Sequence, residues 1–152
     1  MSIRSDEPDL KDSSTILLVE DSRIQKRAIE KILHEADYLV LFAIDGEEAL
    51  RLARECSPDL VLLDLLLPKI GGEEVLYSLK RDLHTEPIPV IVISHLAKGQ
   101  SIELKTMGAT DCFEKSEFLE GSEGDSALLS LIERVFRDCE GRKAMAKHVS
   151  IG

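Results

Sequence analysis

The sequence predicts an α/β fold, a doubly wound five-stranded parallel sheet with helices on both faces. The first observation is a set of five short runs that have the length of buried strands: Thr15–Val19, Tyr38–Ala43, Leu60–Leu63, Val90–Ile93 and the weaker Thr110–Glu114. Continuous apolar runs are typical of strands that are covered on both faces. The second observation is that a segment with helical spacing follows each run, and this strict alternation favours a parallel sheet.

Each of these following segments carries a helical signal of its own. The first helix begins after Ser22, whose hydroxyl is suited to cap it. Asp45 and Gly46 form a turn that caps the second helix, and Gly108 is expected to end the fourth. The helices are marked by Ile24 to Ala36, Glu47–Cys56, Val75 to Leu83, about Gly99–Met107, and Leu128 to Phe136, with Gly141 expected to end the last one.

A single domain is expected in this chain of 152 residues, which is long enough to bury a core without disulfides or metal staples. We place that domain at residues 15–138. Residues 1–14 form an acidic leader without the apolar stretch of a signal peptide, and this leader is expected to be disordered. Residues 139–152 form a basic tail that is expected to be loose.

Charge and composition exclude several classes of function. The net charge of −10 disfavours direct binding to nucleic acid, because phosphate backbones repel an acidic chain. No apolar run approaches the ~20 residues that span a bilayer, so no membrane partner is expected. The three cysteines are widely spaced and odd in number, which fits a cytoplasmic protein better than a disulfide framework or a zinc site.

Polar side chains stand where the predicted strands end. Glu20 and Asp21 follow the first run, Asp64 follows the third, Ser94 closes the fourth, and Lys115 follows the fifth. The carboxyl ends of parallel strands lie along one edge of an open sheet, and ligands bind in the crevice there. Residues almost a hundred positions apart are therefore expected to converge on one site.

The chemistry of this set points to a metal ion and a phosphoryl group. Two like charges ~4 Å apart repel by ~4 kcal/mol at an effective dielectric constant of 20. Three clustered carboxylates therefore need a cation among them, and Mg²⁺ suits a small open site of oxygen ligands. Any one of these residues alone is explained by solvation or helix capping, so the prediction depends on the combination.

The same residues lie in four motifs: Val19-Glu20-Asp21-Ser22, Asp64-Leu65-Leu66-Leu67-Pro68-Lys69-Ile70-Gly71-Gly72, Ser94, and Gly108-Ala109-Thr110-Asp111-Cys112-Phe113-Glu114-Lys115. From about Thr15 to Phe136 the chain resembles the receiver domain of two-component response regulators. The resemblance implies the CheY-like, flavodoxin-like fold. It also implies phosphorelay signalling by protein–protein contact with a downstream target, rather than enzymatic turnover.

The resemblance assigns a role to each residue of the site. Asp64 would accept the phosphoryl group from a phosphohistidine of a histidine kinase or phosphotransfer protein. Asp21, Asp64 and the backbone carbonyl of Leu66 would bind Mg²⁺ directly, and Glu20 would act through water. Lys115 would neutralise charge on the phosphoryl group, and Ser94 would donate a hydrogen bond to it.

Two absences shape the expected function. The chain has neither GxxxxGK[ST] nor GxGxxG, so the phosphoryl donor is expected to be external. The residues after the last helix are too few for an output domain, which favours a stand-alone response regulator. The sequence leaves open whether the protein forms homodimers.

The chain departs from the family pattern near the lysine. Cys112 stands three residues before it, where the family has a switch aromatic, and a small buried filler is favoured there over a redox sensor. Phe113 is expected to face the other side of the sheet. Ser116 replaces a proline, so a trans peptide bond is expected. Residues 116–126 are expected to form a longer loop than is usual in the family. A loop without a specific role is favoured over one that binds a partner.

A further departure concerns the residues that border the phosphoryl group in the family. Here Leu66 and Leu96 offer no polar atom to position a hydrolytic water, so a comparatively long-lived phosphoryl state is expected. His95 stands where a small residue is usual, and lining the surface is favoured over contact with phosphate.

Three alternatives compete with this assignment. A receiver-like adaptor that works without phosphorylation would share the fold, and the changes at Cys112 and Ser116 keep this alternative open. A Mg²⁺-dependent phosphatase would carry a second acid two residues after Asp64, where this chain has leucine. A flavodoxin-like FMN carrier would need a first loop rich in Ser, Thr or Gly, whereas Glu20 and Asp21 would repel the phosphate.

Overall fold

The computed structural model describes residues 13–116 and 122–151, and the chain divides into two compact units after Glu114. Apart from its last two residues, the predicted acidic leader lies outside the described residues, as do residues 117–121 of the predicted long loop. The first unit contains the whole sheet, and the second contains the last helix.

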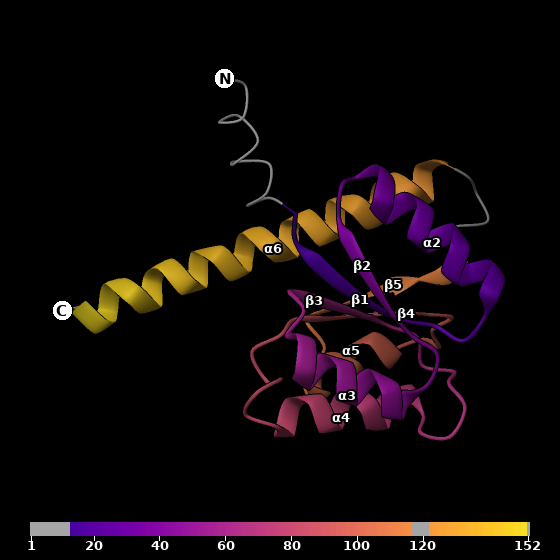
Figure 1. Ribbon diagram of the computed structural model, residues 1–152, viewed down its shortest axis with the longest axis horizontal. Coiled ribbons are helices and arrows are strands. Elements are labelled where there is room, and N and C mark those ends of the chain that lie inside the picture. The colour runs from indigo at the N-terminus through magenta and orange to yellow at the C-terminus, as the bar shows by residue number, and fades with distance from the viewer. Residues whose placement is uncertain (1–12, 117–121, 152) are drawn as a thin grey trace. The chain divides into compact units, whose positions relative to one another are not determined.

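The sheet of the first unit has five parallel strands in the order β2-β1-β3-β4-β5 (Figure 1). The strands are β1 Thr15–Val19, β2 Leu39–Ala43, β3 Leu60–Leu63, β4 Val90–Ser94 and β5 Asp111–Glu114. The chain passes from β1 outward to β2 and then returns to β3 on the other side of β1. The order therefore reverses between β1 and β3, which is the switch point where open α/β sheets bind ligands.

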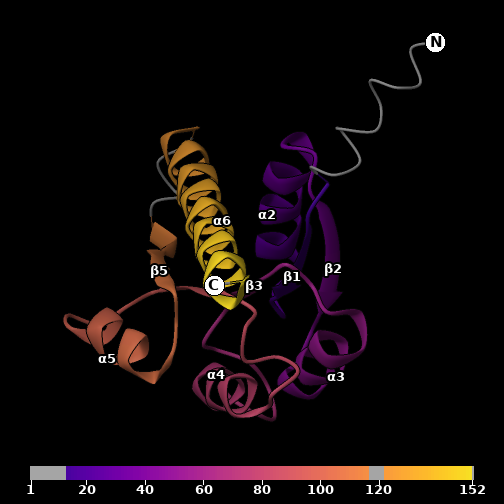
Figure 2. The ribbon, with the colours of Figure 1, turned by 90° about the vertical axis from the view of Figure 1, so that its left-hand side faces the viewer.

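Four helices of the first unit cover both faces of this sheet. They are α2 Arg23–Glu35, α3 Gly46–Cys56, α4 Gly72–Arg81 and α5 Gln100–Met107. Figure 2 shows α2 on one face and α3, α4 and α5 on the other. The predicted fold class is confirmed, with the strand order of a CheY-like receiver fold.

Side-chain alternation along the strands builds two apolar layers. On one face, Leu17, Val61 and Val92 belong to the core cluster that includes residues of α3, α4 and α5. Strands β1, β3 and β4 are buried almost throughout, which is why their sequences read as continuous apolar runs.

Two helix ends have the caps that the sequence predicts. The Ser22 hydroxyl accepts the N–H of Gln25, and Gly108 ends α5 with a φ of 120°. The apolar pattern placed Ile24 and Leu83 on buried helix faces, and this prediction is wrong, because Ile24 is 82% exposed and Leu83 is 91% exposed. Leu83 lies beyond α4, because Asp82 takes an extended conformation and its carbonyl accepts the N–H groups of Thr85 and Glu86 in a turn.

The second unit contains α6, Ser122–Ile151, with Leu128, Leu131, Ile132 and Val135 among its buried residues. The predicted helix end at Gly141 is wrong, because α6 continues ten residues further, to Ile151, so the tail expected to be loose is helical up to that residue. The helix also begins at Ser122, inside the predicted loop 116–126. One glycine inside a helix costs only about 0.5–1 kcal/mol relative to alanine, and Arg142, Lys143 and Ala144 are strong helix formers. None of the described helices combines the length and apolar composition that a membrane crossing requires.

Candidate functional site

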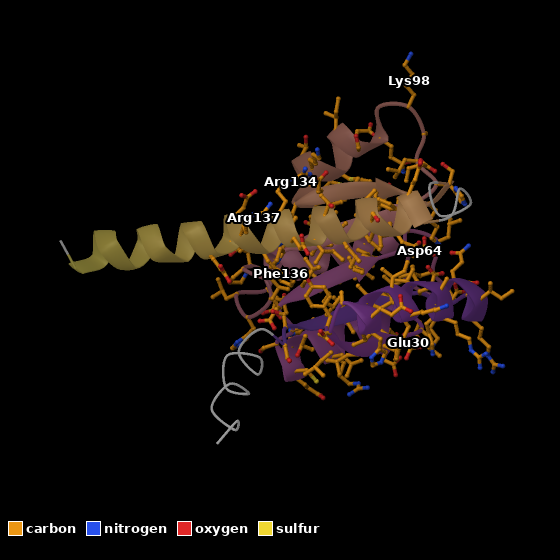
Figure 3. All side chains as sticks on the ribbon, turned by 90° about the horizontal axis from the view of Figure 1, so that it is seen from above. Glu30, Asp64, Lys98, Arg134, Phe136 and Arg137 are labelled. Atoms are coloured by element: carbon orange, nitrogen blue, oxygen red, sulfur yellow. The ribbon has the colours of Figure 1, made fainter. Side chains whose placement is uncertain are left out.

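The candidate site lies at the carboxyl ends of β1 and β3. The N–H of Asp64 donates to the carbonyl of Val19 at 3.1 Å, and the N–H of Glu20 donates to the carbonyl of Ala43 at 3.1 Å. These hydrogen bonds extend the backbone pairing of the sheet one residue beyond β1 and β3. The two acids are therefore placed by the sheet itself, and both are buried (Figure 3 labels Asp64).

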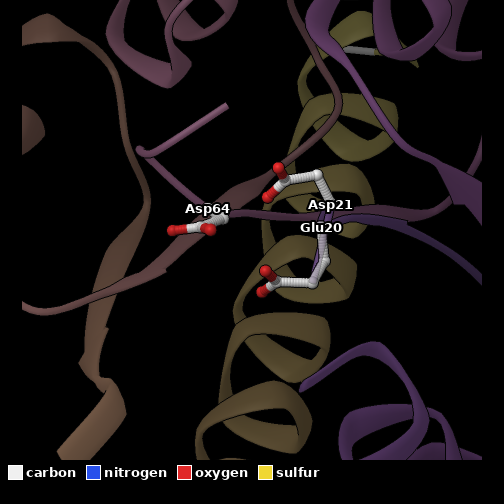
Figure 4. Close-up of side chains that lie close together, drawn as sticks. All are labelled: Glu20, Asp21 and Asp64. Carbon is white, nitrogen blue, oxygen red and sulfur yellow. The ribbon is translucent and has the colours of Figure 1, made fainter. Parts of the chain in front are cut away.

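Three carboxylates converge at this point. Each of Glu20, Asp21 and Asp64 offers an oxygen, and these oxygens lie within 4.8 Å of one another (Figure 4). The side chain of Asp21 is exposed, whereas the other two are buried, so the cluster opens to solvent on one side. Glu20 and Asp21, which follow β1, therefore meet Asp64, which follows β3, as the sequence predicts.

Backbone and side-chain donors hold two of these carboxylates in place. Glu20 Oε2 accepts the N–H of Ser22 at 3.3 Å. Asp64 Oδ1 accepts the N–H of Leu66 at 3.3 Å and the hydroxyl of Ser94 at 3.2 Å. Ser94 closes β4 and is itself buried, so three neighbouring strands contribute to one site.

The donor set fits a hard divalent cation. All three clustered side chains offer only oxygen, and close carboxylates repel one another unless a positive charge lies among them. Magnesium takes such oxygen ligands and usually keeps several waters. The residues present therefore suit Mg²⁺ better than a soft metal, which would favour thiolate ligands.

Lys115 is the first residue of the second unit and follows β5 directly. Its side chain is 8% exposed. In the β4–β5 ladder the preceding residue, Glu114, pairs with Ser94 at the carboxyl ends of both strands. Its contact with a phosphoryl group stays a prediction.

The loop after Asp64 is shaped by a glycine and by a residue in the left-handed region. A Cβ on Gly72 would lie 2.4 Å from the carbonyl oxygen of Asp64, so no larger residue fits there. The N–H of Gly72 closes the loop on the carbonyl of Leu65 at 2.9 Å. Lys69 has a φ of 67°, which is uncommon for a residue with a side chain.

An ion pair joins this loop to α3, and sequence reasoning missed it. Lys69 Nζ lies 3.2 Å from Asp45 Oδ2, while Asp45 Oδ1 caps α3 by accepting the N–H of Glu48 at 2.9 Å. The hydrogen bond from Glu48 and the ammonium group of Lys69 lower the pKa of Asp45. Asp45 in turn raises the pKa of Lys69. The Asp45-Gly46 turn signalled the cap, but nothing in the sequence signalled its ionic partner.

The departures near the lysine have clear local structures. Cys112 packs against the core cluster on the α3–α5 face, and burial raises the pKa of its thiol. Phe113 is also buried but, unlike Cys112, does not belong to that cluster, which agrees with the predicted alternation along the strand. The peptide bond before Ser116 is trans, since no cis bond occurs among the described residues.

A cleft of about 420 Å³ lies beside the hydroxyl of Ser94. Its lining comes from the loops after β3 and β4 and from the start of α4: Leu65, Leu66, Gly71, Gly72, Glu73, Glu74, Ser94, His95 and Gln100. Leu66 is 74% exposed at this place, so an apolar side chain borders the approach to Asp64.

The strand order and the acidic edge define a doubly wound α/β protein with an oxygen-rich site at its switch point. The chain belongs to the response regulator receiver domain family, whose family model matches residues 16–120. It is therefore a receiver domain of the two-component type.

Similar proteins agree with this assignment. The chain is 34% identical over 97 residues to the polar-differentiation response regulator DivK of Brucella ovis, covering 63% of this chain and 79% of DivK. It is 38% identical over 104 residues to the response regulator PleD of Caulobacter vibrioides, covering 68% of this chain but only 23% of PleD.

A solved receiver domain shows the same fold. The receiver domain of the sensor histidine kinase PA1611 from Pseudomonas aeruginosa PAO1 superposes with a TM-score of 0.69 at 24% identity, covering 80% of this chain and 96% of that one. That structure holds a magnesium ion in its active-site cleft.

Proposed function

We propose that this receiver domain works in a phosphorelay by accepting a phosphoryl group on Asp64. The donor is a phosphohistidine of a sensor histidine kinase or of a phosphotransfer protein. The observation that carries the proposal is the Ser94 hydroxyl 3.2 Å from a buried Asp64 carboxylate that also lies within a cluster of three acids. Family membership and the similarity to DivK support it.

The transfer requires one bond to form and one to break. A carboxylate oxygen of Asp64 bonds to phosphorus while the phosphorus–nitrogen bond of the donor breaks. The donor's imidazole leaves with the electron pair of that bond, and it leaves as the neutral ring because its other nitrogen carries the proton. The product is an aspartyl phosphate on this chain.

The site residues have separate tasks in this proposal. The Mg²⁺ ion would be held by Asp21, Asp64 and the backbone carbonyl of Leu66, with Glu20 acting through water. The chemistry that a bound Mg²⁺ supplies is neutralisation of negative charge on the phosphoryl oxygens. Lys115 contributes a further positive charge, and Ser94 donates a hydrogen bond to a phosphoryl oxygen.

Output runs through contact with a downstream protein. Ser94 begins the loop that leads into α5, so a pull on its hydroxyl acts on that loop and on the surface it forms. The chain itself performs only its own phosphorylation and slow dephosphorylation.

The proposal is tested by incubating the protein with acetyl phosphate and Mg²⁺ and recording its intact mass. We expect the wild type to gain one phosphoryl group, and we expect Asp64→Asn to gain none. Asp37→Asn is a matched control, because Asp37 is an exposed aspartate in a turn and asparagine accepts its φ of 68°.

Chelation of Mg²⁺ should abolish the gain in mass. If a wild type saturated with Mg²⁺ gains no mass from acetyl phosphate or from phosphohistidine donors, Asp64 is not a phosphoacceptor. The chain would then act as an adaptor that works without phosphorylation.

A further inference from the structure

The hydroxyl of Ser94 needs a fixed backbone to stay at Asp64. Ser94 is the last residue of β4, and the chain turns away from the sheet immediately after it. The far half of the β4–α5 loop is closed by its own helix. There, Gln100 Oε1 accepts the N–H of Ala97 at 2.8 Å, and the N–H of Gln100 donates to the carbonyl of Ala97 at 3.0 Å.

The near half of the loop is held by Glu114, the last residue of β5. Glu114 Oε1 accepts the N–H of Leu96 at 3.0 Å, and Glu114 Oε2 lies 3.3 Å from Nδ1 of His95. Glu114 pairs with Ser94 in the β4–β5 register. Its side chain therefore reaches His95 and Leu96, the two residues that follow Ser94. By contrast, Lys98 at the tip of the loop points away from the molecule (Figure 3).

Leu96 strengthens this attachment because its side chain packs against the core cluster. A bound backbone N–H and a packed side chain fix the same residue, two positions after Ser94. The residue on β5 that carries an aromatic side chain in the family is Cys112 here, and its thiol fills space against the core. The Glu114 carboxylate provides a contact between β5 and the β4–α5 loop.

We propose that Glu114 is a positioning residue for phosphoryl transfer: its carboxylate holds the β4–α5 loop so that the Ser94 hydroxyl stays at Asp64. The effect of Glu114 on the reaction rate rests on the proposed function. The effect on the loop does not, because it concerns the protein before any phosphoryl group arrives.

The experiment measures two quantities on the full chain. The first is the initial rate of phosphorylation by acetyl phosphate with saturating Mg²⁺, and the second is hydrogen exchange of the Leu96 amide without donor. The variants are Glu114→Ala, Glu114→Gln, Ser94→Ala and the double variant Glu114→Ala with Ser94→Ala. The matched control is Glu103→Ala, which removes an exposed acid from the adjacent helix α5.

Loss of one aligned hydrogen bond should lower the rate about threefold to tenfold in Glu114→Ala. Glu114→Gln keeps the acceptor for the Leu96 N–H and should stay within about twofold of the wild type. In the Ser94→Ala background, Glu114→Ala should have no further effect, because Glu114 acts through Ser94. Exchange at Leu96 should speed up in Glu114→Ala and not in Glu103→Ala.

Two results overturn the inference. One is an unchanged Leu96 exchange rate in Glu114→Ala. The other is an equal loss of phosphorylation with and without Ser94, which would mean that Glu114 only stabilises the fold. A wild type that takes no phosphoryl group overturns the proposed function instead, and the exchange measurement then decides the positioning by itself.

Discussion

At the scale of single residues, the lining of the cleft beside Ser94 includes two unlike side chains, those of Ser94 and Leu66. Ser94 donates a hydrogen bond to the carboxylate of Asp64, whereas Leu66 presents an apolar side chain that is 74% exposed. The hydroxyl is able to hold a phosphoryl oxygen. The leucine has no polar atom with which to orient a water for attack on phosphorus, although its backbone N–H is already bonded to Asp64.

Leu66→Asn should therefore shorten the life of the phosphorylated protein. An amide that aligns one water by a hydrogen bond is expected to speed the loss of the phosphoryl group about threefold to tenfold. The measurement is the decay of the phosphorylated mass after the donor is removed. Ile102→Asn is the control, since Ile102 is 70% exposed but lies on α5. An unchanged decay rate in Leu66→Asn would show that access of water is set elsewhere.

The acids of the site could be predicted from the sequence because their positions follow from strand ends. Glu20, Asp21 and Asp64 each follow an apolar run that is readable without any knowledge of the loops. The contact of Glu114 with Leu96 and His95 could not be predicted in this way. It depends on the path of a loop, and a glutamate near the end of a strand carries no signal of what it will hold.

At the scale of elements, the start of α3 and the β3–α4 loop are joined. Lys69 reaches Asp45 across this junction, and a Cβ on Gly46 would lie 2.7 Å from the side chain of Val75 in α4. The loop that carries the proposed Mg²⁺ ligand Leu66 is thus supported from outside the site. Asp45 has a double role there, because one oxygen caps α3 and the other pairs with Lys69.

Asp45→Asn separates these two roles, since asparagine caps a helix about as well as aspartate but cannot form the ion pair. The pKa of Asp45 is lowered in the folded protein. Its charged form therefore stabilises the fold above the unfolded pKa of ~3.9, and this contribution is lost as the pH falls through the lower folded pKa. We expect wild type to be more stable than Asp45→Asn at pH 7, and we expect the difference to shrink as the pH falls through the lowered pKa of Asp45.

Urea unfolding midpoints of both proteins between pH 3 and pH 7 would measure this difference. Glu47→Gln is the control, because Glu47 is an exposed acid on the same helix, 3.7 Å from the same ammonium group. A difference that persists unchanged at low pH would mean that the asparagine caps α3 poorly and that the ion pair contributes little.

Strand boundaries were predictable to within about one residue, whereas two helix ends were not. Burial on both faces confines polar residues to the ends of these strands, Thr15 in β1 and Ser94 in β4, so the apolar runs mark the strands to within one residue. Helix α4 ends at Arg81 because of a turn made by Asp82, although the apolar spacing runs on to Leu83. Helix α6 passes Gly141 because a single glycine is a weak stop when helix formers follow it.

At the scale of the whole molecule, the acidic cluster links the site to the stability of the fold. The chain has a net charge of −10, and three of its acids meet at the carboxyl ends of two central strands, two of them buried. Repulsion among them opposes folding in the absence of a cation. Any ligand that binds only the folded protein stabilises it by mass action.

Mg²⁺ should therefore raise the melting temperature, and Asp64→Asn should remove most of that response. At a Mg²⁺ concentration about 100 times the dissociation constant, linkage gives ~2.7 kcal/mol, or an increase of about 5–10 °C for a domain of this size. Without Mg²⁺, Asp64→Asn should melt at a higher temperature than the wild type, because one of the three repelling charges is gone. Thermal unfolding of both proteins at matched ionic strength, with Asp37→Asn as control, would measure the two effects. If Asp64→Asn kept the full response to Mg²⁺, the cation would bind elsewhere on this acidic chain, and the three carboxylates would lose their assignment as its site.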